Sequence, residues 1–201
     1  VQTDNFYLIP TAEVPVTNIY RNQIVEAKDL PIRLTAYTPC FRREAGSYGK
    51  DVRGLNRLHQ FDKVEIVQIQ HPDRSYDSLG EMVNHVEGLL KKLELPYRIM
   101  RLCGGDMSFA SALTYDFEVF SAAQKMWLEV SSVSNFETFQ SNRLMLRYRQ
   151  EGEKRNQLVH TLNGSALALP RIVAALLENN QEGDTIRIPK VLQSYCGFDT
   201  I

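Results

Sequence analysis

The sequence predicts an α+β fold, in which an antiparallel β-sheet is flanked by helices. Three observations lead to this prediction. Segments rich in β-branched and aromatic residues follow one another at hairpin spacing. Two long amphipathic helical patterns interrupt them, without the regular strand–helix alternation of a parallel sheet. Neither a G-x-G-x-x-G turn nor a Walker lysine motif follows a predicted strand.

The first predicted unit is a long antiparallel hairpin. Residues 33–43 (RLTAYTPCFRR) and 57–70 (RLHQFDKVEIVQIQ) are strand-like, and a glycine-containing loop separates them. An amphipathic helix follows within 71–96, because apolar residues recur at i, i+3, i+4 and i+7 until Pro96 ends the pattern. Its apolar positions are Leu79, Met82, Val83, Val86, Leu90 and Leu93. Residues 97–102 (YRIMRL) predict a further strand.

The second half of the chain predicts two more strands, over 115–120 and 125–133. Simple alternation in the latter places Trp127, Glu129 and Ser131 on one face. We expect a short helix over 136–147 and a polar, flexible loop over 150–157. The stretch VHTLNGSALALPRIVAALLENNQ predicts a strand that turns through a glycine into a helix. The expected apolar face of that helix comprises Leu169, Ile172, Val173, Leu176 and Leu177.

Composition narrows the class of protein. The chain has 201 residues, 43% of them hydrophobic, and a formal net charge of −1. We therefore expect a single domain over residues 1–201, with anion binding confined to local patches. No run approaches the ~18 apolar residues of a membrane span, so we expect no membrane partner. The opening VQTDNFYLIP has neither a methionine nor a signal-peptide pattern, and we expect a fragment that lacks its true N-terminus.

The cysteines give no sign of a metal or disulfide framework. Cys40, Cys103 and Cys196 are odd in number, far apart and never arranged as C-x-x-C, and the histidines form no zinc-binding pattern. We expect no zinc, and the cysteine usage is typical of a reducing cytosol.

Positive charge gathers in the hairpin sequence FRREAGSYGKDVRGLNRLHQFDKVE, residues 41–65. Arg42 lies at the loop end of its strand, and a guanidinium held there can fork onto a phosphate or a carboxylate. Lys50, Arg53 and Arg57, spaced by glycines, suit an RNA backbone. The alternative is a solvated hairpin tip whose charges pair with one another.

Two segments place oxygen and nitrogen groups near strand ends. In WLEVSSVSNF, Glu129 and Ser132 have the oxygen donors that Mg²⁺ prefers, although they also fit the polar face of an edge strand. In HTLNGSALALPR, Asn163 and Ser165 lie near the turn into the helix, where a serine is most often an N-cap. Arg171, about one and a half turns into that helix, either lies on the surface or projects back toward the strand end.

A fourth segment, LIPTAEVP, and the strand residue Glu65 provide carboxylates. Thr11 and Glu13 in LIPTAEVP follow a predicted strand, and a buried carboxylate there suits an ammonium group. Glu65 lies between valine and isoleucine, so it either faces solvent or belongs to a site.

Taken together, these four segments resemble the catalytic domain of class II aminoacyl-tRNA synthetases, specifically the seryl-tRNA synthetase family. Residues 41–65 look like motif 2 of that class, and HTLNGSALALPRIVAALLENNQ looks like motif 3. LIPTAEVP resembles the Thr-Ala-Glu element that helps to bind serine, and WLEVSSVSNFETFQSNR the metal-binding segment. The resemblance covers nearly the whole chain, including the ending IPKVLQSYCGFDTI.

The resemblance implies a role for each residue. It implies an ATP site of Arg42, Arg43, Glu44, Glu129, Ser132 and Arg171, with Arg42 on the α-phosphate, Glu44 at adenine and Arg171 on the γ-phosphate. Arg42 and Arg171 are the implied catalytic residues, and Glu129 and Ser132 the implied Mg²⁺ ligands. The implied serine site comprises Thr11, Ala12, Glu13, Arg42, Glu65, Asn163 and Ser165. Lys50 and Arg53 are implied to contact the tRNA acceptor end, with Arg57 also facing outward.

The implied activity is ATP-dependent activation of serine, followed by transfer to tRNA(Ser), and to selenocysteine tRNA where that tRNA exists. The implied protein is a cytoplasmic homodimer with no DNA partner. Two features depart from the family: motif 1 and the N-terminal tRNA-binding arm are absent, and Val133 stands where many members have cysteine. Two alternatives stay open, namely a related ligase that charges a carrier protein and a non-catalytic RNA-binding paralogue.

Overall fold

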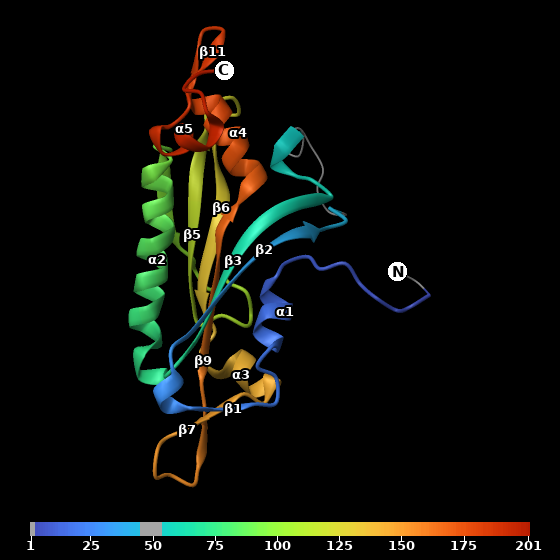
Figure 1. The fold of residues 1–201 in the computed structure, drawn as a ribbon, viewed down its shortest axis with the longest axis vertical. Helices are drawn as coiled ribbons and strands as arrows, with labels where there is room; N and C mark the ends of the chain where they lie inside the picture. Colours follow the sequence, from blue (N-terminus) through green and yellow to red (C-terminus); the bar gives the residue numbers. More distant parts are fainter. Residues whose placement is uncertain (1–2, 45–53) are drawn as a thin grey trace.

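The predicted α+β fold is confirmed by a computed structural model, which describes residues 3–44 and 54–201. Its centre is a six-stranded antiparallel sheet with strand order β2-β3-β9-β6-β5-β4 (Figure 1). These strands are β2 (Ile32–Phe41), β3 (Gln60–Gln70), β4 (Tyr97–Arg101), β5 (Leu113–Ser121), β6 (Met126–Asn135) and β9 (His160–Ala168). The hairpin β2–β3 and the meander β4–β5–β6 were both predicted, and β9 joins them.

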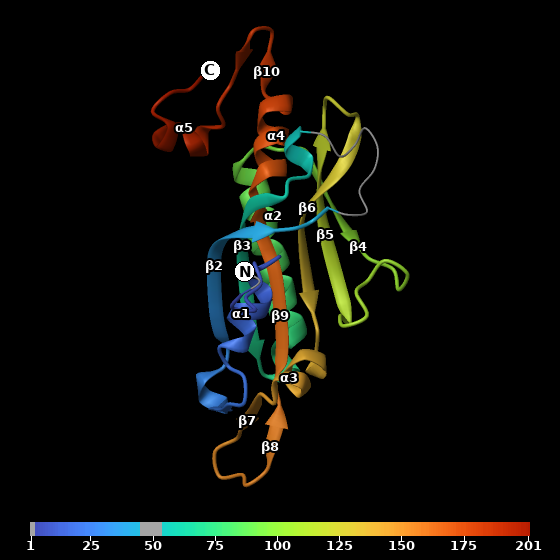
Figure 2. The same cartoon turned by 90° about the vertical axis from the view of Figure 1, so that its right-hand side faces the viewer.

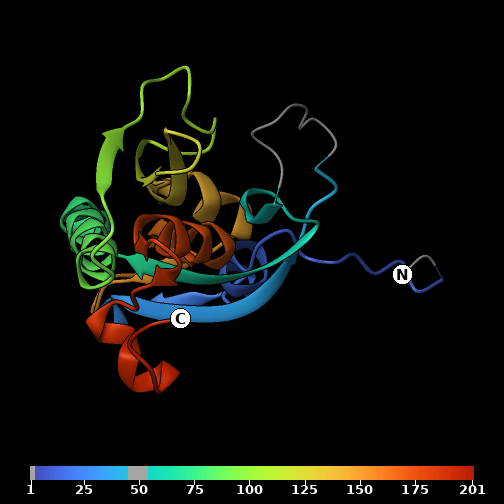
Figure 3. The ribbon, with the colours of Figure 1, turned by 90° about the horizontal axis from the view of Figure 1, so that it is seen from above.

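Five helices surround the sheet in the part of the chain that the structure describes: α1 (Glu13–Asn18), α2 (Ser75–Lys92), α3 (Thr138–Leu144), α4 (Leu169–Asn179) and α5 (Lys190–Cys196). A small sheet of β1 (Ile24–Glu26), β7 (Arg147–Arg149) and β8 (Asn156–Leu158) lies at one end of the molecule. The hairpin of β10 (Gln181–Glu182) and β11 (Thr185–Ile186) lies with α5 at the other end (Figure 2). Seen from above, the N-terminal segment extends away from the sheet (Figure 3).

The sheet has two faces with different coverings. On one face, α2 and α4 close the main core, in which Leu90, Phe117 and Leu162 are completely buried. On the other face, α1 packs through Ala12 and Val16 on Val67 of β3. Because side chains alternate along β3, Lys63, Glu65 and Val67 all point to the face that α1 covers. Ile66 points to the opposite face and packs against the main core.

The helix α2 matches its predicted pattern, since Leu79, Met82, Val86 and Leu90 are all buried. The apolar face of α4 is rotated from the prediction: Ile172 and Ala175 are buried, whereas Val173 and Leu177 are exposed.

Several predicted boundaries were wrong. Residues 3–12 contain no strand, and Glu13 opens the helix α1 rather than lying on a turn after a strand. The predicted helix 136–147 is shorter, because β6 continues to Asn135 and β7 begins at Arg147. The expected loop 150–157 includes the start of β8.

The strand β9 does not turn at Gly164 but runs on to Ala168, so Ser165 is a strand residue and not an N-cap. Pro170 lies in the first turn of α4, as predicted, and Arg171 lies beside it rather than deeper in the helix. Gly164 is needed in mid-strand, because a Cβ there would lie 2.8 Å from Cγ2 of Val133. Val133 itself is completely buried in the main core.

Candidate active site

A pocket of about 450 Å³ opens over the centre of the sheet and collects most of the predicted site residues. It is lined by side chains from β3, β6, β9 and α4, together with the loop end of the β2–β3 hairpin. The predicted residues in its wall are Glu13, Arg42, Glu44, Glu65, Glu129, Ser132, Asn163, Ser165 and Arg171. Residues spread over 159 positions of sequence thus meet because β3, β9 and β6 are neighbours in the sheet.

Not every predicted residue lies in this wall. Thr11 is outside the pocket lining but contacts a lining residue, since its Oγ1 donates a hydrogen bond to Glu65 Oε2 at 3.1 Å. Ala12 is completely buried and packs in the cluster beneath α1. Arg43 is exposed and does not line the pocket. Lys50 and Arg53 lie outside the described residues.

Two carboxylates form an acidic end of the pocket. Glu13 Oε1 accepts a hydrogen bond from Asn163 Nδ2 at 2.5 Å. Glu65 forms an ion pair with Lys63, with 2.8 Å between Nζ and Oε2, and only 3% of the Glu65 side chain is exposed. Burial raises the pKa of Glu65, the Lys63 ammonium lowers it, and the nearby Glu13 carboxylate raises it.

Two arginines form a basic end. The guanidinium of Arg42 lies over the ring of Phe61, 5.1 Å from its centroid. Within residues 3–44 and 54–201, no carboxylate forms an ion pair with Arg42. Arg171 donates to the backbone oxygens of Asn56 and Glu129, which fix its guanidinium at the rim. Arg42 therefore retains donors for an anion from outside the chain.

Glu44 is half-buried and forms an ion pair with Arg57, with 2.7 Å between Oε2 and Nη1. Arg57 was expected to face outward toward RNA, but it lines the pocket and pairs with Glu44. This part of the hairpin is thus ion-paired at the pocket rim, as the alternative interpretation of the charged tip anticipated.

A bulge in β6 brings Glu129 and Ser132 to the same face. Glu129 pairs with Glu118 across the sheet, but Ser131 pairs with Phe117, so Val130 is an extra residue in β6. Ser132 then pairs with Asp116, which shares a face of β5 with Glu118. The prediction that Ser131 shares the face of Glu129 was wrong, because Ser131 is buried and donates to the backbone oxygen of Ser165.

The oxygen groups around this bulge fit a hard divalent cation. Burial raises the pKa of Glu129, the Asp116 carboxylate raises it further, and Arg171 and Arg42 lower it. Asp116 Oδ1 is buried and has no hydrogen-bond partner among the described residues. A cation beside Glu129 and Ser132 would offset this crowding of negative charge, and Mg²⁺ completes its shell with water and phosphate oxygens. The described residues contain no group of three or more His, Cys, Asp or Glu placed to hold a metal ion.

Phe61, Lys63 and Gln140 are among the lining residues to which the sequence gave no role in the site. Phe61 and Lys63 alternate with Glu65 along β3, so the period of two could have found them. Gln140 lies in α3, 127 residues from its partner Glu13, and the motif segment that contains it gave it no role.

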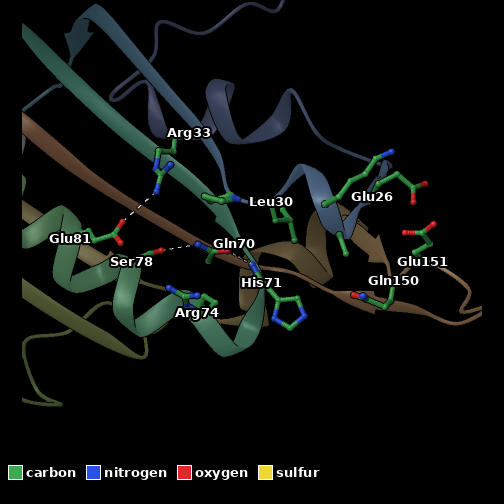
Figure 4. Close-up of a pocket in the computed structure, with 13 residues that line it drawn as sticks. Glu26, Leu30, Arg33, Gln70, His71, Arg74, Ser78, Glu81, Gln150 and Glu151 are labelled. Carbon is green, nitrogen blue, oxygen red and sulfur yellow. Dashed lines mark hydrogen bonds and ion pairs between the residues drawn. The ribbon is translucent and has the colours of Figure 1, made fainter.

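A second cavity, of about 520 Å³, lies away from this pocket, between the start of α2 and the small sheet (Figure 4). Several of its polar groups already have partners: Arg33 pairs with Glu81 at 3.3 Å, and Gln70 donates to Ser78 Oγ at 2.8 Å. Gln70 Oε1 accepts the backbone N–H of His71. Although this cavity is larger, both arginines in its lining are ion-paired, Arg33 with Glu81 and Arg74 with Asp77, and we do not assign the chemistry to it.

Comparison with known proteins identifies the family of the chain. Residues 1–180 match the family model of the tRNA synthetase class II core domain (G, H, P, S and T). The chain belongs to the class II tRNA synthetase family. A serine–tRNA ligase from Salinibacter ruber is 61% identical over 202 residues, which cover all of this chain and 47% of that protein.

Solved class II structures have the same fold. A seryl-tRNA synthetase from Pyrococcus horikoshii, complexed with ATP, superposes with a TM-score of 0.96 at 42% identity, covering this whole chain and 45% of that chain. A cytoplasmic serine–tRNA ligase from Naegleria fowleri, in complex with AMP, gives a TM-score of 0.90 at 31% identity over 95% of this chain and 46% of that one. This class II chain spans a little under half the length of the relatives it matches. None of its described helices is long and apolar enough to cross a bilayer.

Proposed function

We propose that the protein carrying this chain is a serine–tRNA ligase, and that residues 1–201 are one catalytic domain. The observation that carries the proposal is the polarity of the pocket. Its acidic end, at Glu13 and Glu65, suits the ammonium and hydroxyl of serine, and its basic end, at Arg42 and Arg171, suits the phosphates of ATP. The likeness to serine–tRNA ligases and to an ATP complex supports both substrates.

The first step joins the two substrates between these ends. A serine carboxylate oxygen attacks the α-phosphorus of ATP, a P–O bond forms, and the bond to the β-phosphate oxygen breaks to release pyrophosphate. Arg42 holds the α-phosphate and the attacking carboxylate and stabilises the charge that develops on phosphorus. Arg171 holds the γ-phosphate, and Phe61 offers an aromatic face on which adenine can stack beside Glu44.

The metal site fits within this scheme. Glu129 and Ser132 would hold Mg²⁺, which supplies neutralisation of phosphate charge. Positioning of the two substrates does the rest of the work, since neither step requires a protein nucleophile.

The second step moves the seryl group to RNA. A hydroxyl of the 3′-terminal ribose of tRNA(Ser) attacks the carbonyl carbon of seryl-adenylate, and AMP leaves. We assign contact with the acceptor end to Lys50 and Arg53, and we expect the full-length protein to be a cytoplasmic homodimer. That zinc and DNA take no part stays a prediction.

Selection of serine follows from the groups at the acidic end. Glu65, Asn163 and Ser165 lie where they can hydrogen-bond the serine hydroxyl. A site built in this way rejects an analogue without the hydroxyl by ~10⁴-fold or more, because its buried polar groups lose their partners. Alanine and glycine lack that hydroxyl, and threonine adds a methyl group.

The two alternatives receive less support. A non-catalytic paralogue does not require Arg42, Glu129 and Arg171 around one pocket, yet all three line it. A carrier-protein ligase is expected to use cysteine as a metal ligand, whereas Cys40 is buried and both Cys103 and Cys196 are exposed.

The decisive measurement is ATP–pyrophosphate exchange in the full-length protein. We expect serine to support exchange, with alanine, glycine and threonine much weaker. Arg42→Ala should reduce exchange by about 10²-fold or more while circular dichroism shows an intact fold, because a transition-state donor is lost. Absence of exchange with serine, or equal exchange with alanine, would overturn the proposed function.

A further inference from the structure

Gln140, on α3, connects the acidic end of the pocket to the buried part of β9. Its Nε2 donates to Glu13 Oε1 at 3.0 Å, and its Oε1 accepts from Thr161 Oγ1 at 2.7 Å. Asn163 Nδ2 donates to the same Glu13 oxygen. The segment WLEVSSVSNFETFQSNR includes Gln140, but the resemblance assigns it no role, and nothing in the proposed reaction requires it to touch a substrate.

Glu13 and Thr161 hold the two ends of the Gln140 amide. The Thr161 side chain is completely buried, and its hydroxyl donates to the oxygen end of the amide. The nitrogen end must then face Glu13, where it can only donate. A rotated amide would place an oxygen against a carboxylate oxygen, and a carboxylate can only accept, so Glu13 fixes which end of the amide faces it.

This network uses one oxygen of Glu13 and leaves the other available. Oε1 receives both amide donors, whereas no described residue donates to Oε2. The backbone N–H of Glu13 is also held, by Thr11 Oγ1 at 3.2 Å. The carboxylate is therefore fixed at its backbone and at one oxygen before any ligand arrives.

We propose that Gln140 is a positioning residue that orients Glu13 for the ammonium group of the amino-acid substrate. This inference rests on the proposed function. Gln140 acts through Glu13, so its loss should weaken binding of the amino acid without affecting ATP. Binding of an ammonium group to a misoriented carboxylate loses the preorganisation that fixed hydrogen bonds provide.

The test uses Gln140→Met in the full-length protein, because methionine has a similar length and neither donates nor accepts strongly. We expect the KM for serine in pyrophosphate exchange to rise about tenfold or more, since a hydrogen bond to a charged group is lost. The KM for ATP and kcat should change less than about twofold, because the lost contact serves ground-state binding of serine. Gln23→Met is the matched control: Gln23 is exposed, donates to the backbone oxygen of Ile19 at 2.8 Å, and should leave all three constants unchanged.

Gln140→Glu gives a readout that a purely structural role would not move. At alkaline pH, two carboxylates would oppose each other at Glu13 and serine binding should weaken. At acid pH, the pair should share one proton and restore a donor toward Glu13. Glu65 and Lys63 also face Glu13 from β3, whereas Asn163 and Thr161 on β9 are uncharged. Because Glu65 titrates as well, the quantity to follow is the ratio of variant to wild-type KM for serine at each pH, which should fall as pH falls.

The outcomes separate the two proposals. Wild-type protein that shows no serine-dependent exchange overturns the proposed function. Wild-type exchange together with an unchanged KM in Gln140→Met overturns the role of Gln140, as does a loss confined to kcat. If Gln140→Met does not fold, the pH dependence of the Gln140→Glu ratio decides, and a flat ratio overturns the inference.

Discussion

Lys63 and Glu65 form an ion pair that is almost completely withdrawn from solvent, with 10% and 3% of their side chains exposed. Removal of one partner from such a pair leaves the other charge uncompensated. Glu65 is the group that would then be stranded, and burial already raises its pKa. Lys63 therefore controls the pH range over which Glu65 carries a charge.

We predict that Lys63→Met moves the acid limb of the pH profile for serine to higher pH. Loss of the ammonium removes an influence that lowers the pKa of Glu65. As pH falls, Glu65 then takes up a proton earlier, and a protonated carboxyl no longer receives the serine hydroxyl as an anion. The measurement is kcat/KM for serine against pH in pyrophosphate exchange, with Lys63→Arg as the control that keeps a positive charge. Superimposable profiles for Lys63→Met and wild type would contradict this role.

At the scale of elements, the close approach of β6 and β9 depends on one glycine. Val133 pairs with Gly164 across the two strands, and a Cβ at Gly164 would lie 3.2 Å from the Ser132 backbone oxygen as well as 2.8 Å from Val133 Cγ2. Because both contacts involve the packed interior, neither can relax freely. The strands that carry Ser132 and Ser165 can approach this closely because Gly164 has no side chain.

We predict that Gly164→Ala lowers the free energy of unfolding by about 1–3 kcal/mol, because an extra methyl group overpacks the interior. Gly80→Ala is the matched control. Gly80 is exposed in α2 and a Cβ there would meet nothing within 4 Å, so alanine should stabilise the protein by about 0.5–1 kcal/mol. Urea denaturation of both variants measures the difference, and equal effects at the two sites would refute the packing argument.

The sequence predicted elements where local periodicity is strong and failed where tertiary contacts decide. The 3.6-residue pattern predicted α2 correctly, since Leu79, Met82, Val86 and Leu90 are all buried. The bulge at Val130 has no signature of its own, so simple alternation placed Ser131 on the wrong face. Gly164 suggested a turn, yet its function is a close approach to another strand, which only the fold reveals.

The candidate site shows the same division. Most of the described polar residues that the four motifs singled out meet in one pocket, and motif resemblance had already grouped Glu65, Glu129 and Arg171. Resemblance could not show that Arg57 pairs with Glu44, or that Gln140 holds Glu13 across 127 positions of sequence. Such partners depend on how strands distant in sequence are aligned.

At the scale of the whole molecule, the strand order makes β9 the central connection. It pairs with β3 on one side and β6 on the other, and its residues Thr161 and Leu162 are completely buried. Among the described strands, β4 pairs only with β5, and three of its five residues are exposed. We therefore expect the free energy of local opening to be higher for β9 at the centre of the sheet than for β4 at its edge.

We predict that amides of β9 exchange with solvent as slowly as those of β3 and β6, and much more slowly than those of β4. Opening β9 requires both halves of the sheet to separate, whereas β4 can open alone. Hydrogen exchange followed by mass spectrometry on the full-length protein provides the measurement. Faster exchange in β9 than in β4 would show that the two halves are not joined in the way that the strand order implies.

The position of β9 also has a consequence for synthesis. Once residues 1–159 have emerged from the ribosome, the hairpin bearing Arg42 and Glu65 and the meander bearing Glu129 are both present, but no strand yet pairs with both. Each half then presents an unpaired strand edge, which is a template for association with other chains. The nine residues of β9 close both edges together and bring the acidic end, Arg42 and the cation ligands to one pocket, to which α4 then adds Arg171. In a nascent chain, the strand edges of β3 and β6 are therefore covered by the same step that assembles most of the pocket.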